Sequence, residues 1–339
     1  MKILVIGGSG FIGTGLAGAL VKCGHEVSIF DNRLSHAWPG SACRGDVRDV
    51  DALVKASRGV EVIYNLAAEH KDDISPVSLY YDVNAGGAKN VAAAAEQNGV
   101  KKIVFTSSVA VYGLNKRNPD ESSQAEPFNH YGRSKLQAEK ILEDWAARGP
   151  DRSLSIVRPA VIFGEGNRGN VYNLIKQIQS GRFMMVGRGM NCKSMGYVEN
   201  LTGFLGHLLN AGPGKRLFNF ADKPDLSVQE LVGIIRAELG IKERMAALPF
   251  YVGLLGGVFF DVIGFFTGKK FPVSSIRIRK FCAETTVSTE ALEATGFKPP
   301  HTLEDGLKKM IASLKKSPDI EIPSRMPPVF DRGGHSDRP

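Results

Sequence analysis

The sequence is poor in cysteine, with four among 339 residues: Cys23, Cys43, Cys192 and Cys282. None of them pairs in a CxxC motif, and their wide spacing argues against a disulfide framework and against a cysteine-bound metal cluster. We therefore expect a reducing compartment and no metal site.

We also expect no secretory leader, because residues 2–6 form a short apolar run without a following small-residue cleavage site. The net charge of +8 would suit an anionic partner or surface. The lysines and arginines are scattered, however, and no nucleic-acid module such as a zinc finger occurs. We expect a cytoplasmic protein that binds no nucleic acid.

The composition is that of an ordinary soluble enzyme, with 43% hydrophobic and 23% charged residues and no repeat. Fibrous and wholly disordered structures are excluded, and the length suits one large domain or two ordinary ones.

Short apolar runs alternate with segments of helical length and spacing. The runs typical of buried parallel strands are 2–6, 26–30, 62–66, 102–106, 154–157 and 217–220. Segments 11–23, 76–98 and 129–148 are predicted helices between them. This order predicts an α/β fold with a doubly wound parallel sheet.

The alternation loosens after about residue 164, which predicts a second, smaller lobe. Two helices there begin with capping signatures, Ser227-Val-Gln-Glu230 and Thr302-Leu-Glu-Asp305. Residues 317–339 are rich in proline and glycine and lose periodicity, so we expect a disordered tail.

A glycine-rich turn, Gly7-Gly8-Ser9-Gly10-Phe11-Ile12-Gly13, follows the first predicted strand directly. Its small residues allow a tight turn that would present a helix N-terminus to a pyrophosphate. The alternative is a plain connection between a strand and a helix, since such a turn alone is weak evidence.

Asp31 ends the second predicted strand, where a carboxylate can accept hydrogen bonds from the adenosine ribose and repel a 2′-phosphate. Arg33, two residues on, could instead serve a 2′-phosphate. The pattern favours NAD over NADP.

Tyr131 and Lys135 lie four residues apart near the start of a predicted helix, so they share one face. A nearby cation lowers the pKa of a phenol, which would let Tyr131 act as a base. A solvated Tyr/Lys pair is the alternative. The run Thr106-Ser107-Ser108 follows another strand and sets hydroxyls at the carboxyl edge of the sheet, where such folds bind ligands.

Together these motifs resemble the extended short-chain dehydrogenase/reductase family of nucleotide-sugar epimerases and dehydratases. The resemblance covers roughly residues 1–315. It rests on the glycine turn, Asp31, Asp46-Val47, Leu66-Ala67-Ala68, the Ser-Ser-x-x-Val-Tyr-Gly stretch ending at Gly113, Tyr131-x-x-x-Lys135 and Arg158-Pro-Ala-Val-Ile-Phe-Gly164.

The resemblance implies a role for each matching residue. Tyr131 would be the acid/base, Lys135 would lower its pKa and hold the nicotinamide ribose, and Ser108 would bind the sugar oxygen. The implied NAD contacts are Gly7, Gly10, Phe11, Ile12, Gly13, Asp31, Asn32, Arg33, Asp46, Val47, Leu66, Ala67, Ala68, Asn84, Ser107, Tyr131, Lys135, Pro159 and Val161. For Asp46 and Asn84, an ordinary helix-capping role is the alternative.

The same resemblance implies a Rossmann-type NAD domain at 1–165, joined by 195–235, and a smaller C-terminal α/β substrate lobe at 166–194 and 236–316. Sugar dehydratases of the family carry an Asp-Glu pair where this sequence has Val109-Ala110-Val111. Dehydration is therefore not expected.

Several runs outside the cofactor motifs resemble the 4-epimerases of N-acetylglucosaminyl-diphospho-undecaprenol in bacterial O-antigen (lipopolysaccharide) synthesis. They include Ala67-Ala-Glu-His70, residues 75–82, Asn167-Arg-Gly-Asn170 and the three residues that follow it, Lys193-Ser-Met195 and Lys280-Phe-Cys-Ala283. This implies an isomerase that interconverts GlcNAc and GalNAc on undecaprenyl diphosphate. The alternatives are a UDP-N-acetylglucosamine 4-epimerase, an NAD-dependent sugar or sterol-like dehydrogenase, and a dinucleotide-sensing protein without chemistry.

A diphosphate substrate requires cations, and the candidates are Arg168, Arg188, Lys193, Arg277 and Arg279. Lys193 and Arg279 are the preferred candidates for binding the diphosphate, and Lys193 matches a phosphate-binding arginine of related epimerases. His70 and Asn170 are further expected substrate contacts. For each cation a solvated surface position is the alternative. We also expect a homodimer.

Residues 248–267 form an apolar stretch with six aromatic residues and one charge, Asp261, followed by Lys269 and Lys270. It could span a membrane, form a buried helix of the lobe, or lie in a membrane interface. The aromatic and basic residues favour the interface. We therefore expect peripheral association with the inner face of the cell membrane.

Overall fold

The computed structural model describes residues 1–71, 74–114, 116–242, 247–268 and 274–316. The predicted tail, 317–339, lies outside these residues.

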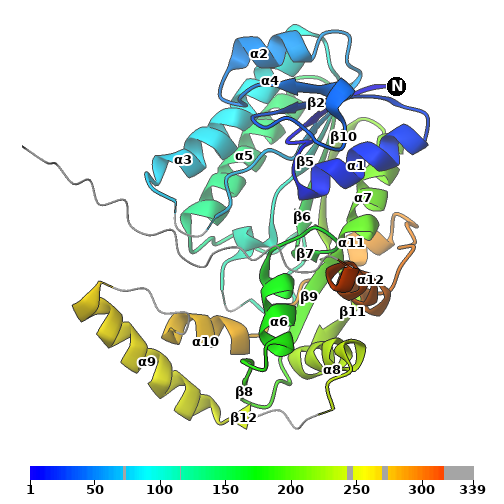
Figure 1. Ribbon diagram of the computed structural model, residues 1–339. Coiled ribbons are helices and arrows are strands. Elements are labelled where there is room, and N and C mark those ends of the chain that lie inside the picture. The colour runs from blue at the N-terminus through cyan, green and yellow to red at the C-terminus, as the bar shows by residue number, and fades with distance from the viewer. Residues whose placement is uncertain (72–73, 115, 243–246, 269–273, 317–339) are drawn as a thin grey trace, which may run out of the picture.

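Seven parallel strands form the central sheet in the order β10-β6-β5-β4-β1-β2-β3 (Figure 1). They are β1 Lys2–Ile6, β2 Glu26–Asp31, β3 Ala42–Arg44, β4 Val62–Asn65, β5 Lys102–Thr106, β6 Ser153–Pro159 and β10 Gly214–Phe220. The chain leaves β1 toward β2 and β3 and later returns to β1's other edge with β4. Folds of this kind bind their ligands in the crevice at such a switch point, which here is the carboxyl ends of β1 and β4. The predicted doubly wound α/β fold is confirmed.

Helices cover both faces of this sheet. On one face α1 Phe11–Lys22 packs against α7 Val198–His207, and α11 Glu290–Glu293 lies beside β10. On the other face lie α2 Val50–Ala56, α4 Gly87–Gln97 and α5 His130–Ala147. Leu53, Val91 and Leu142 of these three helices are fully buried in one core with the apolar side chains of β1, β4 and β5. The buried strands explain the continuous apolar runs in the sequence.

Several elements differ from the predicted ones, and among them α2 was not predicted. The edge strand β3 was missed, because its three residues are largely exposed and carry no apolar run. The predicted helix at 76–98 begins at Ser78 as α3 Ser78–Tyr80, continues as the π-helical turn η2 Tyr81–Gly86 and ends as α4. Short 3-10 helices are η1 Pro39–Ser41, η3 Val109–Tyr112 and η4 Leu208–Asn210.

A smaller lobe surrounds a three-stranded sheet, β11-β9-β7. Its strands are β7 Val161–Phe163, β9 Cys192–Tyr197 and β11 Asp222–Ser227, and a second sheet pairs β8 Met185–Val186 with β12 Ala247–Leu248. Helices α6 Asn170–Gln179, α8 Val228–Leu239 and α12 Leu303–Lys316 share one core beside these strands. Both predicted caps are confirmed: Glu230 N donates to Ser227 Oγ (3.2 Å) and Asp305 N to Thr302 Oγ1 (3.1 Å).

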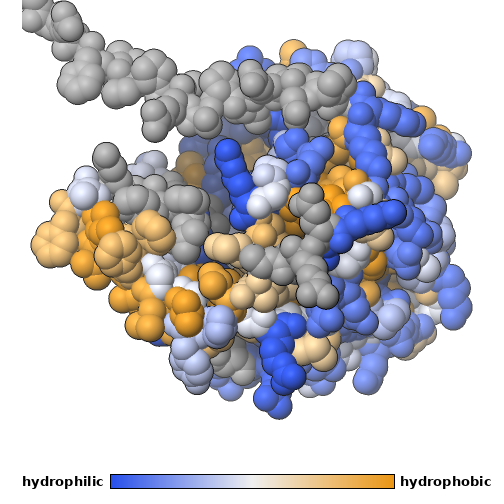
Figure 2. Space-filling view, turned by 60° about the horizontal axis from the view of Figure 1, so that its bottom comes forward, coloured by the Kyte–Doolittle hydropathy of each residue, from blue (hydrophilic) through white to orange (hydrophobic). Residues whose placement is uncertain are grey.

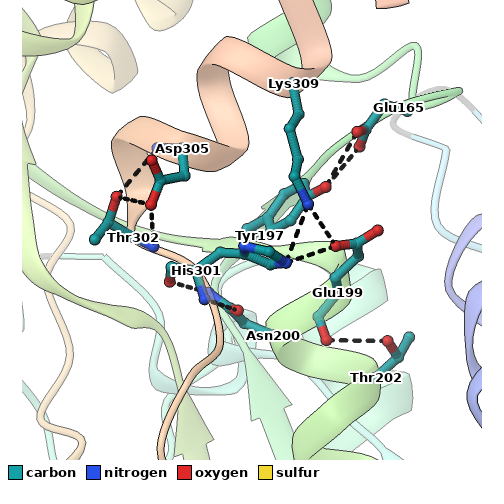
Figure 3. Close-up of polar contacts among 9 residues, drawn as sticks. All are labelled: Glu165, Tyr197, Glu199, Asn200, Thr202, His301, Thr302, Asp305 and Lys309. Atoms are coloured by element: carbon teal, nitrogen blue, oxygen red, sulfur yellow. Dashed lines mark hydrogen bonds and ion pairs between the residues drawn. The ribbon is translucent and has the colours of Figure 1, made fainter.

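A polar network holds α12 onto the end of β9 (Figure 3). The Tyr197 hydroxyl donates to the Glu165 carboxylate (2.9 Å), which lies in the loop after β7. Glu199 of α7 pairs with both His301 (2.8 Å) and Lys309 (2.9 Å). The network thus ties α12, β9, α7 and the loop after β7 to one another.

Helix α9 Phe250–Thr267 projects from the lobe beside α10 Ser275–Cys282 (Figure 1). The buried residues of α9 are Gly253 and Gly257, and 11% of the helix is buried. By length and composition it could cross a membrane. The alternative of a buried lobe helix is wrong, because Phe265 and Phe266 are 85% and 81% exposed.

Candidate active site

The glycine turn forms a close cradle at the carboxyl end of β1. Gly7 has a φ of 79°, and a Cβ atom there would lie 2.7 Å from the backbone nitrogen of Ala67. A Cβ on Gly13 would lie 2.4 Å from the Gly7 oxygen. Any side chain would therefore fill this space.

The cradle leads into the N-terminus of α1, which has no side-chain cap and no acidic residue in its first turn. Its first backbone N–H groups lack intrahelical acceptors, and the helix dipole favours an anion there. The residues present fit a dinucleotide pyrophosphate.

Asp31 lies beside the same turn at the end of β2. Its Oδ2 accepts from Ser9 N and its Oδ1 from Arg33 N, each at 3.0 Å. The carboxylate is largely buried and therefore held at the turn, as the predicted ribose contact requires. The Arg33 and Asn32 side chains are exposed beside it.

Asp46 and Val47 follow β3 and have different surroundings. Two Arg48 nitrogens donate to the Asp46 carboxylate, at 3.0 and 2.6 Å, and hold its pKa below the usual range. Val47 is buried, and a Cβ on Gly87 of α4 would lie 2.9 Å from it. An adenine amino group at Asp46 would share the carboxylate with Arg48.

Tyr131 and Ser108 meet where α5 begins. Asn129 caps α5 by accepting from Gly132 N at 2.8 Å, which places Tyr131 in the first turn. Ser108 caps η3 by accepting from Ala110 N at 3.2 Å. Burial raises the pKa of Tyr131, while a hydrogen bond with Ser108 lowers it. The structure therefore brings the two predicted catalytic hydroxyls together.

Lys135 is buried one turn further along α5. Its Nζ donates to the Thr106 carbonyl at the end of β5 (2.8 Å) and lies 4.8 Å from the centre of the Phe105 ring. Burial lowers the pKa of Lys135 to about 7, and the Glu139 carboxylate opposes the shift. The remaining N–H groups of the ammonium have hydrogen-bonding capacity for a ribose hydroxyl.

Two polar side-chain atoms at this edge of the sheet are buried without a hydrogen-bond partner among the described residues: Asn65 Oδ1 at the end of β4 and Ser107 Oγ after β5. Orphaned buried polar atoms are rare and costly in folded proteins. A polar cofactor in the crevice would satisfy them. Asn65 was missed in the sequence, because only the folded sheet shows that its amide lies at the crevice edge.

Asn84, a predicted NAD contact, has protein partners for its side chain. Its Oδ1 accepts from Glu69 N (2.9 Å), and its Nδ2 donates to Glu69 O (3.0 Å) and Ser134 Oγ (2.8 Å). Ser134 Oγ in turn donates to the Tyr131 carbonyl at 2.8 Å. In the structure Asn84 joins the π-helical turn to the segment carrying Ala67 and Ala68 and to α5.

A buried ion pair beneath the site was also missed. Arg158 of β6 donates to both oxygens of Glu139 on α5, at 2.9 and 2.6 Å, and to the Tyr112 hydroxyl of η3 at 2.9 Å. Tyr112 then donates to Asn219 Oδ1 of β10 at 2.8 Å. These contacts fix α5 and η3, which carry Tyr131 and Ser108, on the sheet. The pairing joins distant parts of the sequence, so no local pattern could reveal it.

Of the four further predicted substrate residues, three lie in the lobe and His70 lies outside it. Lys193 Nζ donates to the carbonyls of Lys280 (3.2 Å) and Ala283 (2.9 Å), so it binds the carboxyl end of α10. Arg279 is an exposed residue of α10, and Asn170 begins α6. His70 follows β4, in the segment beside Asn84. Among the described residues, no group of acidic, histidine and cysteine side chains is arranged to hold a metal.

The model of the NAD dependent epimerase/dehydratase family matches residues 3–221. The chain belongs to this family. The NAD cofactor predicted from Asp31 and the glycine turn is confirmed with it.

One relative of this chain is the N-acetyl-alpha-D-glucosaminyl-diphospho-ditrans,octacis-undecaprenol 4-epimerase of Escherichia coli O157:H7. It is 50% identical over 91% of this chain and 94% of that protein. The UDP-glucose 4-epimerase of Vibrio cholerae is 27% identical over 91% of this chain and 94% of that protein. Among solved structures, UDP-N-acetylglucosamine 4-epimerase from Bacillus cereus has a TM-score of 0.73 at 17% identity, over 93% of this chain and 99% of that chain. The last likeness shows the shared fold.

Proposed function

We propose that this chain is an NAD-dependent 4-epimerase that interconverts GlcNAc and GalNAc on undecaprenyl diphosphate. The observation that carries the proposal is the 50% identity over 91% of the chain to an epimerase named for that substrate. The hydrogen bond between Ser108 and Tyr131, one helical turn from Lys135, supports the proposal. An epimerase needs a group that accepts and returns a proton at the sugar hydroxyl.

The NAD-binding residues proposed are those that surround the crevice. Gly7, Gly10 and Gly13, with Phe11 and Ile12, would present the α1 N-terminus to the pyrophosphate. Asp31 would accept from the ribose, and Lys135 would donate to the nicotinamide ribose. Leu66, Ala67, Ala68, Ser107, Pro159 and Val161 would line the nicotinamide half.

When bound, NAD supplies a reversible hydride acceptor whose oxidised ring carries a positive charge. Tyr131 takes the proton of the C4 hydroxyl at its phenol oxygen, and Ser108 donates a hydrogen bond to the same sugar oxygen as it becomes a carbonyl. After the 4-keto sugar has turned over, Tyr131 returns the proton. The hydrogen bond with Ser108 opposes the burial that raises the pKa of Tyr131. The ammonium of Lys135 and the charge of the ring would lower this pKa further.

We also propose that the enzyme acts at the cytoplasmic face of the membrane, held there by α9. Hydrophobic side chains gather on this projecting helix (Figure 2), including Tyr251, Leu255, Phe265 and Phe266. The glycine face of α9 packs on the lobe, where a Cβ on Gly253 would lie 2.7 Å from Val186. The bulky face is therefore the exposed one, which suits an aromatic helix in a lipid interface.

The test is incubation of purified protein and NAD with GlcNAc-diphospho-undecaprenol, followed by analysis of the released sugar. Formation of GalNAc without accumulation of NADH supports the proposal. Stoichiometric NADH would instead indicate a dehydrogenase. Turnover of UDP-GlcNAc alone would indicate the UDP-sugar epimerase. The predicted homodimer is tested by light scattering on the same preparation.

A further inference from the structure

Helix α10 contacts the exposed helix α9 at one end and, at the other, the residue just before the cap of α5, the helix that carries Tyr131 and is called the catalytic helix below. At its N-terminus, Ser275 N donates to Asp261 Oδ2 of α9 at 3.0 Å, and a Cβ on Gly257 of α9 would lie 2.8 Å from Ser275 N. At its C-terminus, Lys280 Nζ lies 5.6 Å from the centre of the Phe128 ring. Phe128 directly precedes Asn129, the cap of the helix that carries Tyr131.

Hydrogen bonds from two residues, Lys193 of β9 and Asn191 just before β9, hold the end of α10 that carries Lys280. Lys193 Nζ donates to the carbonyls of Lys280 and Ala283, and Asn191 Nδ2 donates to those of Phe281 (2.9 Å) and Ala283 (3.1 Å). Two donor groups with four hydrogen bonds to the end of one helix restrain its backbone. The contact between Lys280 and Phe128 therefore belongs to an anchored helix end.

Apolar surface continues along the outer side of α10. Ile276 is 64% exposed, and Lys280 lies four residues later on the same face, whereas Ile278 on the opposite face is buried. Phe128 keeps 42% of its surface exposed beneath Lys280. An aromatic ring, an ammonium and an isoleucine thus form a strip that leads from the catalytic helix toward α9.

This strip combines the two kinds of group that the part of a polyprenyl-diphosphate sugar beyond the sugar requires, a cation for phosphate and apolar side chains for the lipid. The reacting sugar is followed by two phosphates and then by an apolar chain. With the sugar at Tyr131, the part of the chain between the diphosphate and the membrane must pass along exposed apolar surface or lie in water at a cost in free energy.

We propose that Phe128 and Ile276 bind the first isoprene units of the substrate, beside the ammonium of Lys280. The inference rests on the proposed function and assigns the binding site of the lipid chain. Phe128 is then a specificity residue: it favours a lipid-linked sugar over a sugar nucleotide, and it takes no part in proton transfer.

The experiment compares two substrates in the same detergent micelles: GlcNAc-diphospho-undecaprenol and GlcNAc diphosphate bearing only a methyl group, which cannot reach the proposed site. Phe128→Ser should lower kcat/KM for the undecaprenyl substrate about tenfold, mainly through KM, because apolar burial is lost. Turnover of the methyl substrate should change less than about twofold. Phe128→Leu, which keeps an apolar side chain, should restore most of the difference.

Val21→Ser is the matched control, since Val21 is 41% exposed near the far end of α1. It should leave both substrates unchanged. Vesicle binding of Phe128→Ser should equal that of wild type, which separates chain binding from membrane binding. An equal loss of both substrates, or no loss of either, overturns the inference. The proposed function itself is contradicted if wild-type protein turns over UDP-GlcNAc but neither of the two GlcNAc diphosphate substrates.

Discussion

Gly132 and Ala110 set the distance between the two helices that carry the catalytic hydroxyls. A Cβ atom on Gly132 would lie 2.5 Å from the Ala110 carbonyl oxygen and 2.9 Å from Pro127. Contacts that short do not occur in folded proteins, so the first turn of α5 can approach η3 this closely only with glycine. This approach brings Tyr131 of α5 to Ser108, the cap of η3.

Gly132→Ala should therefore separate the two hydroxyls. The obstructing atom is backbone and cannot rotate away, so α5 or η3 must shift, at a cost of about 1–3 kcal/mol in the free energy of unfolding. We expect activity to fall at least about 100-fold, because small misplacements of catalytic groups cost that much. Denaturant unfolding and turnover assays measure both effects.

Gly206→Ala on α7 is the matched control, since a Cβ there meets nothing within 4 Å. It should leave activity unchanged and raise stability by up to about 1 kcal/mol, the helix preference of alanine over glycine. A Gly132→Ala enzyme as active as Gly206→Ala would refute the steric argument.

Tyr131→Phe should remove the transferable proton and keep the ring. General acid–base groups contribute about 10²–10⁴-fold, and the loss of turnover should be of that order while NAD still binds. Ser108→Ala should also impair turnover with less effect on NAD affinity. Isothermal titration with NAD beside the turnover assay distinguishes the two properties; near-normal turnover of Tyr131→Phe would contradict its role as the acid/base.

The sequence predicted the sheet and the cofactor turn because both depend on local patterns. Parallel strands buried on both faces, such as β4 and β5, leave continuous apolar runs. The glycine turn directly follows one such run. Edge strand β3 is exposed and three residues long, so it leaves no comparable pattern.

The remaining features depend on tertiary contacts. The carboxylate of Glu139 and the guanidinium of Arg158 form their pair only once α5 packs on β6. Lys193 was predicted to bind phosphate, but no pattern could show that its ammonium binds the end of α10. The exposure of α9 was equally undetermined, since buried and interfacial helices share its composition and only packing shows that its glycines face inward.

Asp31→Ala should weaken NAD binding and relax discrimination against NADP. The ribose acceptor and the charge that repels a 2′-phosphate disappear together. Charge-assisted hydrogen bonds are worth roughly 1.5–3 kcal/mol, so NAD affinity should fall about 10- to 100-fold. Titration of both cofactors against wild type and variant measures the change; equal affinity of the wild type for NAD and NADP would count against this role.

The protonation of Asp222 should make the free energy of unfolding depend on pH. It is buried, its Oδ2 accepts from Tyr197 N at 2.7 Å, and its Oδ1 has no hydrogen-bond partner among the described residues. Burial raises the pKa of Asp222 to about 6, although hydrogen bonds from Tyr197 and Asn200 and the nearby His301 oppose the shift. The folded protein therefore holds this proton more tightly than the unfolded chain, and the stabilisation is lost as pH rises through about 6.

Asp222→Asn should accordingly be more stable than wild type above pH 6, by about 2–3 kcal/mol, because it keeps the acceptor for Tyr197 N without the buried charge. The difference should shrink between about pH 6 and pH 4 and vanish below, where the carboxyl is neutral in both states. Asp144→Asn on the exposed face of α5 removes the same charge as a control. Denaturant unfolding at several pH values provides the measurement, and a pH-independent difference would contradict the assigned titration.

Replacing Phe259, Phe265 and Phe266 with serine should release the protein from anionic vesicles. These side chains are 61%, 85% and 81% exposed on α9, so the substitutions remove little internal packing and the thermal unfolding of the variant should match wild type. Burying even half of one phenylalanine is worth roughly 1 kcal/mol, and three such losses should weaken partition about 100-fold. Co-sedimentation with phosphatidylglycerol vesicles measures this, and turnover of the methyl diphosphate substrate should survive. Unaltered vesicle binding would show that α9 is not the membrane contact. An unfolded variant would show instead that these aromatic side chains stabilise the lobe itself.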